Sequence, residues 1–249
     1  MPTLILSPRH TEDSQTLWRA AIAKGWDVER LPSWTVSDVL LSAPEPVLYI
    51  EALMAPHVAS QFGLTLVEPP EDWLPRLPAE YRRREVRLSN LGLERSNVDP
   101  AFIKPPNDKS FPAGVYTGEQ LPREFDDGTA VLVAEVVAWE SEFRVFIADN
   151  RVRALSIYLR DGLLQRDAGF DSSITEAAEA RAFAEAVLGD RRVEIPRAVV
   201  MDIGVVRGRG WAVVELNAAW GSGLYGCDPA SVLDVLRSAA EPTGIDPAA

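Results

Sequence analysis

The residues whose types and spacing most clearly indicate chemistry are Asp202, Glu215 and Asn217, within the sequence AVVMDIGVVRGRGWAVVELNAAW at 198–220. Two apolar runs flank the sequence RGRG at 207–210, and a two-residue loop that begins with glycine suits a type II′ hairpin turn. Counting outward from this turn places Asp202 directly opposite Glu215, with Asn217 two residues along on the same face. The hairpin therefore predicts three converging oxygen donors.

The two opposed carboxylates need a neutralising partner. Directly opposed side chains lie about 4.5 to 5.5 Å apart at Cβ, and like charges there are destabilising. Hard oxygen ligands without sulfur or imidazole favour magnesium or manganese, and magnesium completes its shell with water and phosphate oxygens. The pattern therefore points to a nucleoside triphosphate. The alternative is a solvated acidic face, and a one-residue slip of the hairpin would separate Asp202 from Glu215.

The same register predicts which side of the hairpin faces the core. It places Gly204 opposite Val213, two residues beyond the acidic pair. The opposite face is then a continuous apolar layer, formed by Met201, Ile203, Val205, Ala212, Val214 and Leu216.

The composition is that of an acidic globular protein. Among 249 residues, 25 Lys and Arg face 37 Asp and Glu, and the net charge of −12 argues against nonspecific binding to nucleic acid or anionic membranes. A hydrophobic content of 47% can fill the core of one large or two modest domains. The single cysteine, Cys227, and only two histidines predict neither a disulfide nor a zinc cluster. We expect a cytoplasmic protein without membrane spans.

The N-terminal region predicts a small α/β domain. Strands at 3–7 and 26–31 flank an amphipathic helix at 12–24, which makes a β-α-β unit, and no glycine fingerprint for a dinucleotide follows the first strand. The elements that repeat this theme and predict a small parallel sheet are a strand at 47–51, a helix at 55–62 and a strand at 64–67.

A connection rich in proline and acid, at 69–78, precedes a basic segment at 79–90 that we interpret as a helix. Its Arg82, Arg83 and Arg84 could hold a phosphate or a carboxylate. A run of charges on a helix is more often a solvated face, and we interpret these arginines in that way. The predicted domains are therefore residues 1–95 and 96–249.

From residue 101 onward the sequence is typical of antiparallel β-structure with glycine and proline turns. The expected strands precede and follow a turn at Asp149-Asn150, and helices lie on either side of the acidic hairpin. These elements are strands at 101–104, 130–137, 142–148 and 151–159, and helices at 174–188 and 229–239.

Three basic residues could serve an anionic ligand of the hairpin. Lys104 ends a strand and Lys109 lies in the following loop, where two ammonium groups can hold phosphate oxygens, although lysines at strand ends are often simply solvated. Arg144 lies within an otherwise apolar strand and needs a partner. The sequence leaves open whether that partner is Glu142 or a ligand phosphate.

The order of these elements resembles the ATP-grasp superfamily, and especially its clade marked by one arginine and two lysines. The matching order is a lysine strand, a lysine loop, a hinge strand, an arginine strand, a helix and the Asp and Glu-x-Asn hairpin, covering 101–239. The resemblance implies an α+β fold, in which a small α/β domain precedes an ATP-grasp domain of antiparallel sheets and helices.

The resemblance also implies roles for individual residues. Lys104 and Lys109 would contact phosphates, and Arg144 would contact a phosphate or an acyl-phosphate intermediate. The loop after Lys104 departs from the pattern, because it has three prolines and only Gly114 where many ATP-grasp loops are glycine rich. Backbone groups of the hinge would bind adenine and side chains of the hairpin would hold magnesium; these residues are Glu135, Val136 and Val137, and Asp202, Glu215 and Asn217.

The expected activity is that of an ATP-dependent ligase that joins a carboxylate to an amine or a thiol through an acyl phosphate, with ATP and Mg²⁺ or Mn²⁺ as cofactors. Small molecules and peptides are both expected substrates, and a homodimer is left open. The alternatives are an ATP-dependent phosphotransferase and a noncatalytic module that binds a nucleotide or a partner protein. The sequence identifies neither the acid nor the amine.

Overall fold

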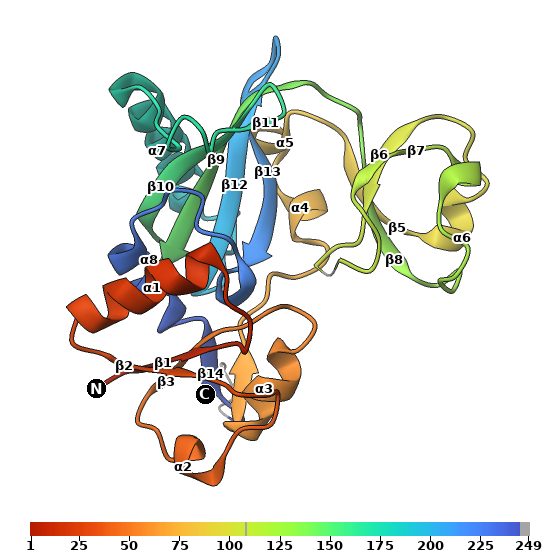
Figure 1. The fold of residues 1–249 in the computed structure, drawn as a ribbon. Coiled ribbons are helices and arrows are strands. Elements are labelled where there is room, and N and C mark those ends of the chain that lie inside the picture. Colours follow the sequence, from red (N-terminus) through yellow and green to blue (C-terminus); the bar gives the residue numbers. More distant parts are fainter. Residues whose placement is uncertain (108, 245–249) are drawn as a thin grey trace.

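The computed structural model describes residues 1–107 and 109–244, which form three packed parts (Figure 1). A central antiparallel sheet has an α/β part at one end and a smaller four-stranded lobe at one side. The predicted α+β architecture is therefore confirmed. Among the described residues, no helix is both long and apolar enough to cross a lipid bilayer.

The N-terminal part contains the predicted parallel sheet, with the strand order β2-β1-β3. Helix α1 (Glu12–Ala23) connects the first two strands, and it begins at Thr11 because the Thr11 side chain accepts the Ser14 N–H. The remaining elements are β1 (Thr3–Leu6), β2 (Asp27–Arg30), β3 (Pro46–Tyr49), α2 (Asp38–Leu41) and α3 (Ala55–Gln61).

The end of the chain completes this N-terminal part. Strand β4 (Leu64–Leu66) does not join the parallel sheet, but pairs antiparallel with β14 (Ala240–Pro242). Helix α8 (Pro229–Leu236) is capped by Asp228, whose side chain accepts the Ser231 N–H, and it packs against α1 in the same hydrophobic core. The N-terminal core therefore depends on residues from both ends of the chain.

The smaller lobe is an antiparallel sheet with the strand order β5-β8-β6-β7. The lobe also contains helix α6 (Leu91–Glu94) and the short 3₁₀ helix η1 (Gly118–Gln120). Its strands are β5 (Val86–Asn90), β6 (Ala101–Lys104), β7 (Gly114–Tyr116) and β8 (Ala130–Ala134).

The helix predicted at 79–90 is wrong over most of its length. Only α5 (Ala79–Arg82) is helical, because Arg83 takes a left-handed conformation with φ 49° and ends the turn. The next residues form β5, whose pairing with β8 overrides their helix propensity. Helix α4 (Trp73–Arg76) lies just before them. The predicted domain boundary at residue 95 would therefore separate β5 from its own sheet.

The central sheet is antiparallel, with the strand order β11-β10-β9-β12-β13. Helix α7 (Ile174–Gly189) begins at a capping box formed by Ser173 and Glu176. The strands are β9 (Trp139–Ala148), β10 (Arg151–Arg160), β11 (Leu163–Leu164), β12 (Ala198–Val206) and β13 (Gly210–Ala218), followed by η2 (Ala219–Gly221).

Strand alternation gives the central sheet two different faces. On one face, residues such as Phe143, Met201 and Ile203 pack with α7 in a hydrophobic core. The other face carries Arg144 on β9 and Asp202 on β12, which are paired across the two strands. The polar residues of the predicted site therefore share the face that looks away from α7.

The hairpin turn is longer than predicted. Val206 pairs with Gly210, so the loop at 207–209 has three residues rather than two. The Arg209 N–H donates to Val206 O at 2.9 Å, and both Gly208 and Gly210 have positive φ, at 73° and 83°. Glycine is needed at these positions because other side chains are strained there.

A β-bulge at Val214 compensates for the longer turn. The pairing shifts by one residue there, so Asp202 lies opposite Glu215, as predicted. The predicted apolar layer is wrong at Val214. Because of the bulge, Val213 is buried in the core instead, and Val214 lines the cavity between the sheets. The pairing of Asp202 with Glu215 was therefore predicted correctly, although the length of the turn was predicted wrongly.

The longer turn also moves Gly204, which lies opposite Ala212 rather than Val213. Replacing Gly204 with alanine should destabilise the protein, because the new Cβ would lie 2.5 Å from Ser141 O on β9, a backbone atom that cannot move alone. We expect a loss of about 1 to 3 kcal/mol in the free energy of unfolding, measured in urea.

The matched control is Gly189→Ala at the end of α7, where nothing lies within 4 Å of the added Cβ. This variant should be as stable as the wild type or slightly more stable. An equal loss in both variants would contradict the close packing of β9 against β12.

Candidate active site

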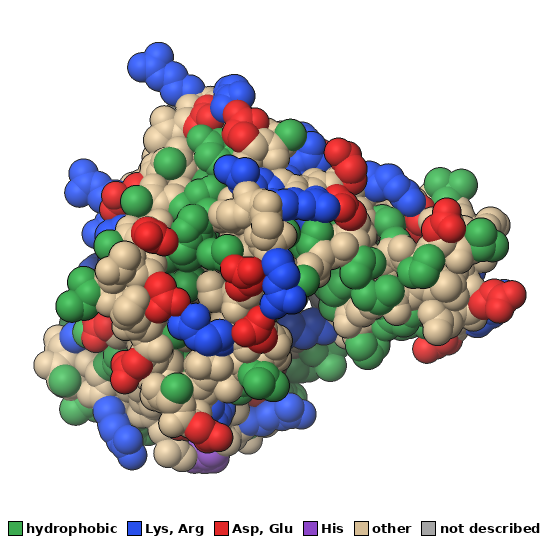
Figure 2. All heavy atoms as spheres, turned by 90° about the horizontal axis from the view of Figure 1, so that it is seen from above, with side chains coloured by type: hydrophobic (Ala, Val, Ile, Leu, Met, Phe, Trp, Pro, Cys, Tyr) green, Lys and Arg blue, Asp and Glu red, His purple; other side chains and the backbone are tan. Residues whose placement is uncertain are grey.

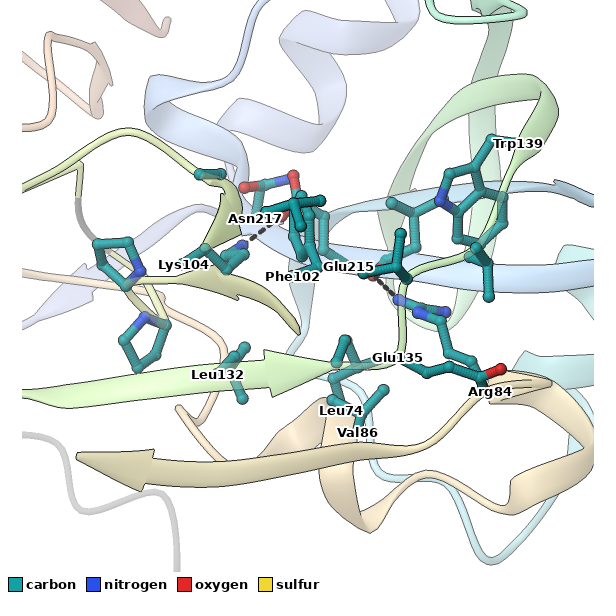
Figure 3. Close-up of a pocket in the computed structure, with 18 of the residues that line it drawn as sticks. Leu74, Arg84, Val86, Phe102, Lys104, Leu132, Glu135, Trp139, Glu215 and Asn217 are labelled. Atoms are coloured by element: carbon teal, nitrogen blue, oxygen red, sulfur yellow. Dashed lines mark hydrogen bonds and ion pairs between the residues drawn. The ribbon is translucent and has the colours of Figure 1, made fainter. Parts of the chain in front are cut away.

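A cavity of about 400 Å³ lies between the smaller lobe and the central sheet. Its volume suits a small-molecule ligand. Viewed from above, the lobe stands apart from the body of the molecule beside a notch (Figure 2). The apolar lining includes Leu74, Val86, Phe102 and Leu132, and the polar lining includes Lys104, Glu215 and Asn217 (Figure 3). Glu142 also lines the cavity.

The hinge at residues 135–138 joins β8 to β9 and borders the cavity. The strand predicted at 130–137 therefore ends earlier, at residue 134. Glu135, Val136 and Val137 all line the cavity, where we predicted the adenine site. The Glu135 N–H donates to Glu85 O at 2.9 Å, so this backbone donor is already used within the lobe.

Residues in the turn of the acidic hairpin form hydrogen bonds and ion pairs with this hinge. Arg209 donates to both carboxylate oxygens of Glu135, at 3.0 and 2.5 Å. Arg207 donates its backbone N–H to Ala138 O at 2.9 Å, and its side chain lies 3.5 Å from Glu140. These ion pairs are largely exposed to solvent, so they contribute little to stability.

Lys104 extends from the lobe to the acidic hairpin. Its ammonium donates to Glu215 Oε2, and Asn217 Nδ2 donates to Glu215 Oε1 at 2.9 Å. Burial alone would raise the pKa of Glu215, but the charge and hydrogen bond of Lys104 and the hydrogen bond of Asn217 lower it. Glu215 is therefore an anion, and a lysine of the opposite lobe neutralises it.

Arg144 pairs with Asp202 inside the central sheet. Arg144 Nε lies 3.0 Å from Asp202 Oδ1 and Nη2 lies 2.7 Å from Oδ2, which is a two-point ion pair. Both residues are buried. The sequence offered Glu142 or a phosphate as partner, whereas the structure supplies Asp202. Burial alone would lower the pKa of Arg144, but the negative charge and hydrogen bonds of Asp202 outweigh burial and raise the pKa above its ordinary value.

Aromatic rings and a loop carbonyl complete the surroundings of Arg144. Its Nη1 donates to Gly223 O at 3.0 Å. Its guanidinium carbon lies 4.6 Å from the ring centre of Tyr225 and 5.4 Å from that of Tyr158. The two rings are stacked at 5.2 Å. These contacts fix the plane of the guanidinium.

The predicted metal ligands differ in their exposure to the cavity. Glu215 and Asn217 line it, but Asp202 is 0% exposed and both of its oxygens accept from Arg144. Within residues 1–107 and 109–244, no group of three or more His, Cys, Asp or Glu is placed to hold a metal. Magnesium fits this arrangement only by taking most of its ligands from phosphate and water, which is its usual behaviour.

Lys109 lies in the loop that closes one side of the cavity. It lines the cavity and is exposed. Pro105 and Pro106 also line this wall, and Asn107 Nδ2 donates to Pro69 O at 2.7 Å, which attaches the loop to the proline-rich connection at 69–78. Both predicted lysines therefore face the same cavity.

Sequence reasoning missed the carboxylate of Glu142 as part of the site. Tyr158 donates to Glu142 Oε2 at 2.8 Å, and both residues line the cavity. Burial, helped by the charges of Asp202 and Glu215, raises the pKa of Glu142 to about 7, against the lowering effects of the Tyr158 hydrogen bond and the charge of Arg84. The sequence did contain an indication of this role, because Glu142 lies two residues before Arg144 and therefore on the same face of the strand.

Arg84 was also missed, because the segment was interpreted as a solvated helix. Its guanidinium donates to Val213 O at 2.7 Å and to Val214 O at 2.8 Å, and it lies 5.0 Å from the ring centre of Trp139. Figure 3 shows it against one end of the cavity, below Trp139 and beside Glu135. Only the pairing of β5 in the lobe could have revealed this position.

Comparison with known families gives one match. The model of an ATP-grasp domain, family 2 of the clade marked by one arginine and two lysines, matches residues 81–235. This range contains every residue that the sequence singled out for the site. No curated protein sequence matches the chain significantly.

Several solved structures share the fold at low sequence identity. D-cycloserine synthetase DcsG is 14% identical, with a TM-score of 0.61 over 95% of this chain and 99% of its own. D-alanine–D-alanine ligase from Bacillus anthracis is 10% identical, with a TM-score of 0.54 over 96% of both chains. The macrocyclase MdnC from Microcystis aeruginosa MRC, bound with precursor peptide MdnA, is 13% identical, with a TM-score of 0.51 over 95% and 99%.

The raised pKa of Glu142 should make stability depend on pH. The folded protein keeps a proton on Glu142 up to pH of about 7, whereas the unfolded chain releases it near the ordinary value of 4.5. The free energy of unfolding should therefore fall as pH rises through this interval. The expected fall in the free energy of unfolding is on the order of 3 kcal/mol, and Glu142→Gln should abolish this contribution to the pH dependence. Urea unfolding of both proteins at a series of pH values measures the difference.

The control is Glu140→Gln, which changes an exposed carboxylate on the same strand. It should retain the pH dependence of the wild type. Parallel pH profiles for the wild type and Glu142→Gln would show that Glu142 does not keep its proton in the folded state.

Proposed function

The chain belongs to the clade of the ATP-grasp superfamily that is marked by one arginine and two lysines, and we propose that it is an ATP-dependent ligase that joins a carboxylate to an amine or a thiol. The observation that carries this proposal is the convergence of Lys104, Glu215 and Asn217 at one end of a cavity whose other end is the hinge. Such a cavity can hold a planar base at one end and phosphates at the other.

Charge supports this orientation of the nucleotide. The hinge end of the cavity is bordered by Val136, Val137 and Trp139, which suit an apolar base. Lys104 and Lys109 line the cavity from the lobe, and their ammonium groups can neutralise phosphate oxygens. We therefore keep both lysines as phosphate contacts.

Magnesium fits beside Glu215 and Asn217, and when bound it would neutralise phosphate charge. Asp202 would support these ligands from below, because Asn217 Nδ2 also donates to Asp202 Oδ2 at 3.2 Å. Direct coordination by Asp202 would first require an oxygen now paired with Arg144. Because Glu215 and Asn217 line the cavity and Asp202 does not, we propose these two as the metal ligands.

Arg144 retains donors for a reacting group. An arginine has five N–H donors, and the bonds to Asp202 and Gly223 O use three of them. We propose that Arg144 contacts a phosphate or the acyl phosphate with the remaining donors. Its charge would stabilise the anionic transition state without any covalent step at the protein.

The reaction proposed for this site has two balanced steps. The substrate carboxylate attacks the γ-phosphorus of ATP, which forms an acyl phosphate and releases ADP. An amine or thiol then attacks the acyl carbon, and inorganic phosphate leaves. The chain positions the reactants and neutralises developing charge, which is sufficient for catalysis of phosphoryl transfer.

The substrates remain a class rather than a compound. The solved structures named above include enzymes for small amino-acid derivatives and one bound with a precursor peptide. We therefore propose either a small-molecule or a peptide carboxylate and amine for this chain.

Nucleotide binding is tested by thermal unfolding with a nonhydrolysable ATP analogue, with and without Mg²⁺. A ligand that binds only the folded state stabilises it by about 2.7 kcal/mol at one hundred times its Kd. We expect a Mg²⁺-dependent rise in Tm for the wild type that Glu215→Gln abolishes. The control Glu179→Gln, at an exposed position on α7, should keep the full rise. A wild type that gains no stability would contradict the nucleotide site.

Ligation is tested with ATP, Mg²⁺ and panels of carboxylates with hydroxylamine, which traps acyl phosphates as hydroxamates. We expect hydroxamate and ADP in equal amounts, and a fall of about a hundredfold or more for Lys104→Met. A stable phosphorylated product without hydroxamate would instead indicate a phosphotransferase. Unchanged turnover in the Asp202→Ala, Glu215→Ala double variant would refute the assignment of the hairpin.

A further inference from the structure

The bulge at Val214 decides which face of β13 presents Glu215. Without the bulge, the pairing that begins with Val206 and Gly210 would place Asp202 opposite Val214 and Met201 opposite Glu215. Because side chains alternate along a strand, Glu215 would then point to the core side of the sheet. The extra residue returns Glu215 to the cavity side.

Arg84 binds the backbone at this bulge. β13 is the edge strand of the central sheet, so its outer backbone groups lack a neighbouring strand. Arg84 donates from Nη1 to Val213 O and from Nη2 to Val214 O, at 2.7 and 2.8 Å. In a regular strand, consecutive carbonyls point in opposite directions, so one planar fork can reach both only where the strand is irregular.

The rest of the Arg84 side chain is held firmly in place. Its Nη1 also donates to Arg82 O at 3.1 Å, and the guanidinium faces the ring of Trp139. Burial lowers the pKa of Arg84 to about 10, although the charges of Glu215 and Glu142 oppose this effect. The group is therefore a desolvated cation at neutral pH, and such a group requires fixed acceptors.

We propose that Arg84 is a positioning residue that fixes the bulge and thereby the cavity-facing orientation of Glu215. The consequence for catalysis rests on the proposed function, because Glu215 matters there as a magnesium ligand. Lys104 and Asn217 bind the carboxylate of Glu215, and the Arg84 fork holds the two carbonyls that precede it. Removal of the fork should therefore weaken what Glu215 contributes.

A double-mutant cycle with Arg84→Met and Glu215→Gln tests this coupling. The first readout is the Mg²⁺-dependent affinity for a nonhydrolysable ATP analogue. We expect Glu215→Gln to weaken binding at least tenfold in the wild type, but less than threefold in the Arg84→Met background. Equal effects in both backgrounds would overturn the proposal, because Glu215 would then keep its role without Arg84.

The matched control is Arg83→Met. Arg83 is the neighbouring arginine and donates to Trp211 O on the same strand, but not to the bulge carbonyls. In this background Glu215→Gln should retain its full tenfold effect. Arg84→Lys keeps the charge but loses the planar fork, so it should behave like Arg84→Met. A full tenfold effect of Glu215→Gln in the Arg84→Lys background would show that the charge alone suffices, and would overturn the role of the planar fork.

A second readout does not depend on the proposed function. The same cycle measured by urea unfolding reports the Lys104–Glu215 ion pair in the free protein. Glu215→Gln should lower the unfolding midpoint in the wild type and in Arg83→Met, and change it little in Arg84→Met. If the wild type fails to bind the nucleotide, the proposed function fails, but this readout still decides the role of Arg84. An unchanged effect of Glu215→Gln in Arg84→Met would overturn that role.

Discussion

The buried ion pair of Arg144 and Asp202 is the interaction on which the rest of the site depends. Neither charge could stay inside the central sheet without the other, since an unpaired buried charge costs several kcal/mol. The pair crosses from β9 to β12 at directly opposed positions, so it also fixes their register. Asn217 bridges Asp202 and Glu215, and Glu215 binds Lys104 of the smaller lobe. A continuous polar chain thus leads from the centre of the sheet into the opposite wall of the cavity.

The same pair is anchored from the N-terminal part. Gly223 O accepts from Arg144, and the loop that carries Gly223 is fixed on both sides of it. Tyr49 donates to Ser222 O at 3.2 Å, and the Leu224 N–H donates to Asp13 at 3.1 Å. All three parts of the molecule therefore meet in one hydrogen-bonded network. The small α/β part and the end of the chain also share one hydrophobic core, which includes Leu224 of this loop.

The sequence was informative where periodicity decides the structure. The alternation in the acidic hairpin predicted the face that Asp202, Glu215 and Asn217 share, since a period of two is set locally. It could not reveal that a longer turn and a bulge at Val214 cancel each other, because both leave that alternation almost unchanged. The role of Arg84 depends on contacts with residues about 130 positions away, and no local pattern encodes them. The same holds for the pairing of Arg144 with Asp202 rather than with the nearby Glu142.

If the chain binds a nucleotide and a metal as proposed, the network would link the two binding events. In the free protein Lys104 neutralises Glu215, so the site needs no metal to remain stable. If Lys104 turns toward a phosphate, Glu215 loses its partner and becomes an uncompensated carboxylate, which a cation can neutralise. Under the proposed function, phosphate binding would therefore make a metal at Glu215 more favourable, and metal binding would in turn release Lys104 for the phosphate. By linkage the two effects must be equal in free energy. The free protein exposes one neutral pair, and the nucleotide with its metal would separate that pair into two oppositely charged ligand sites.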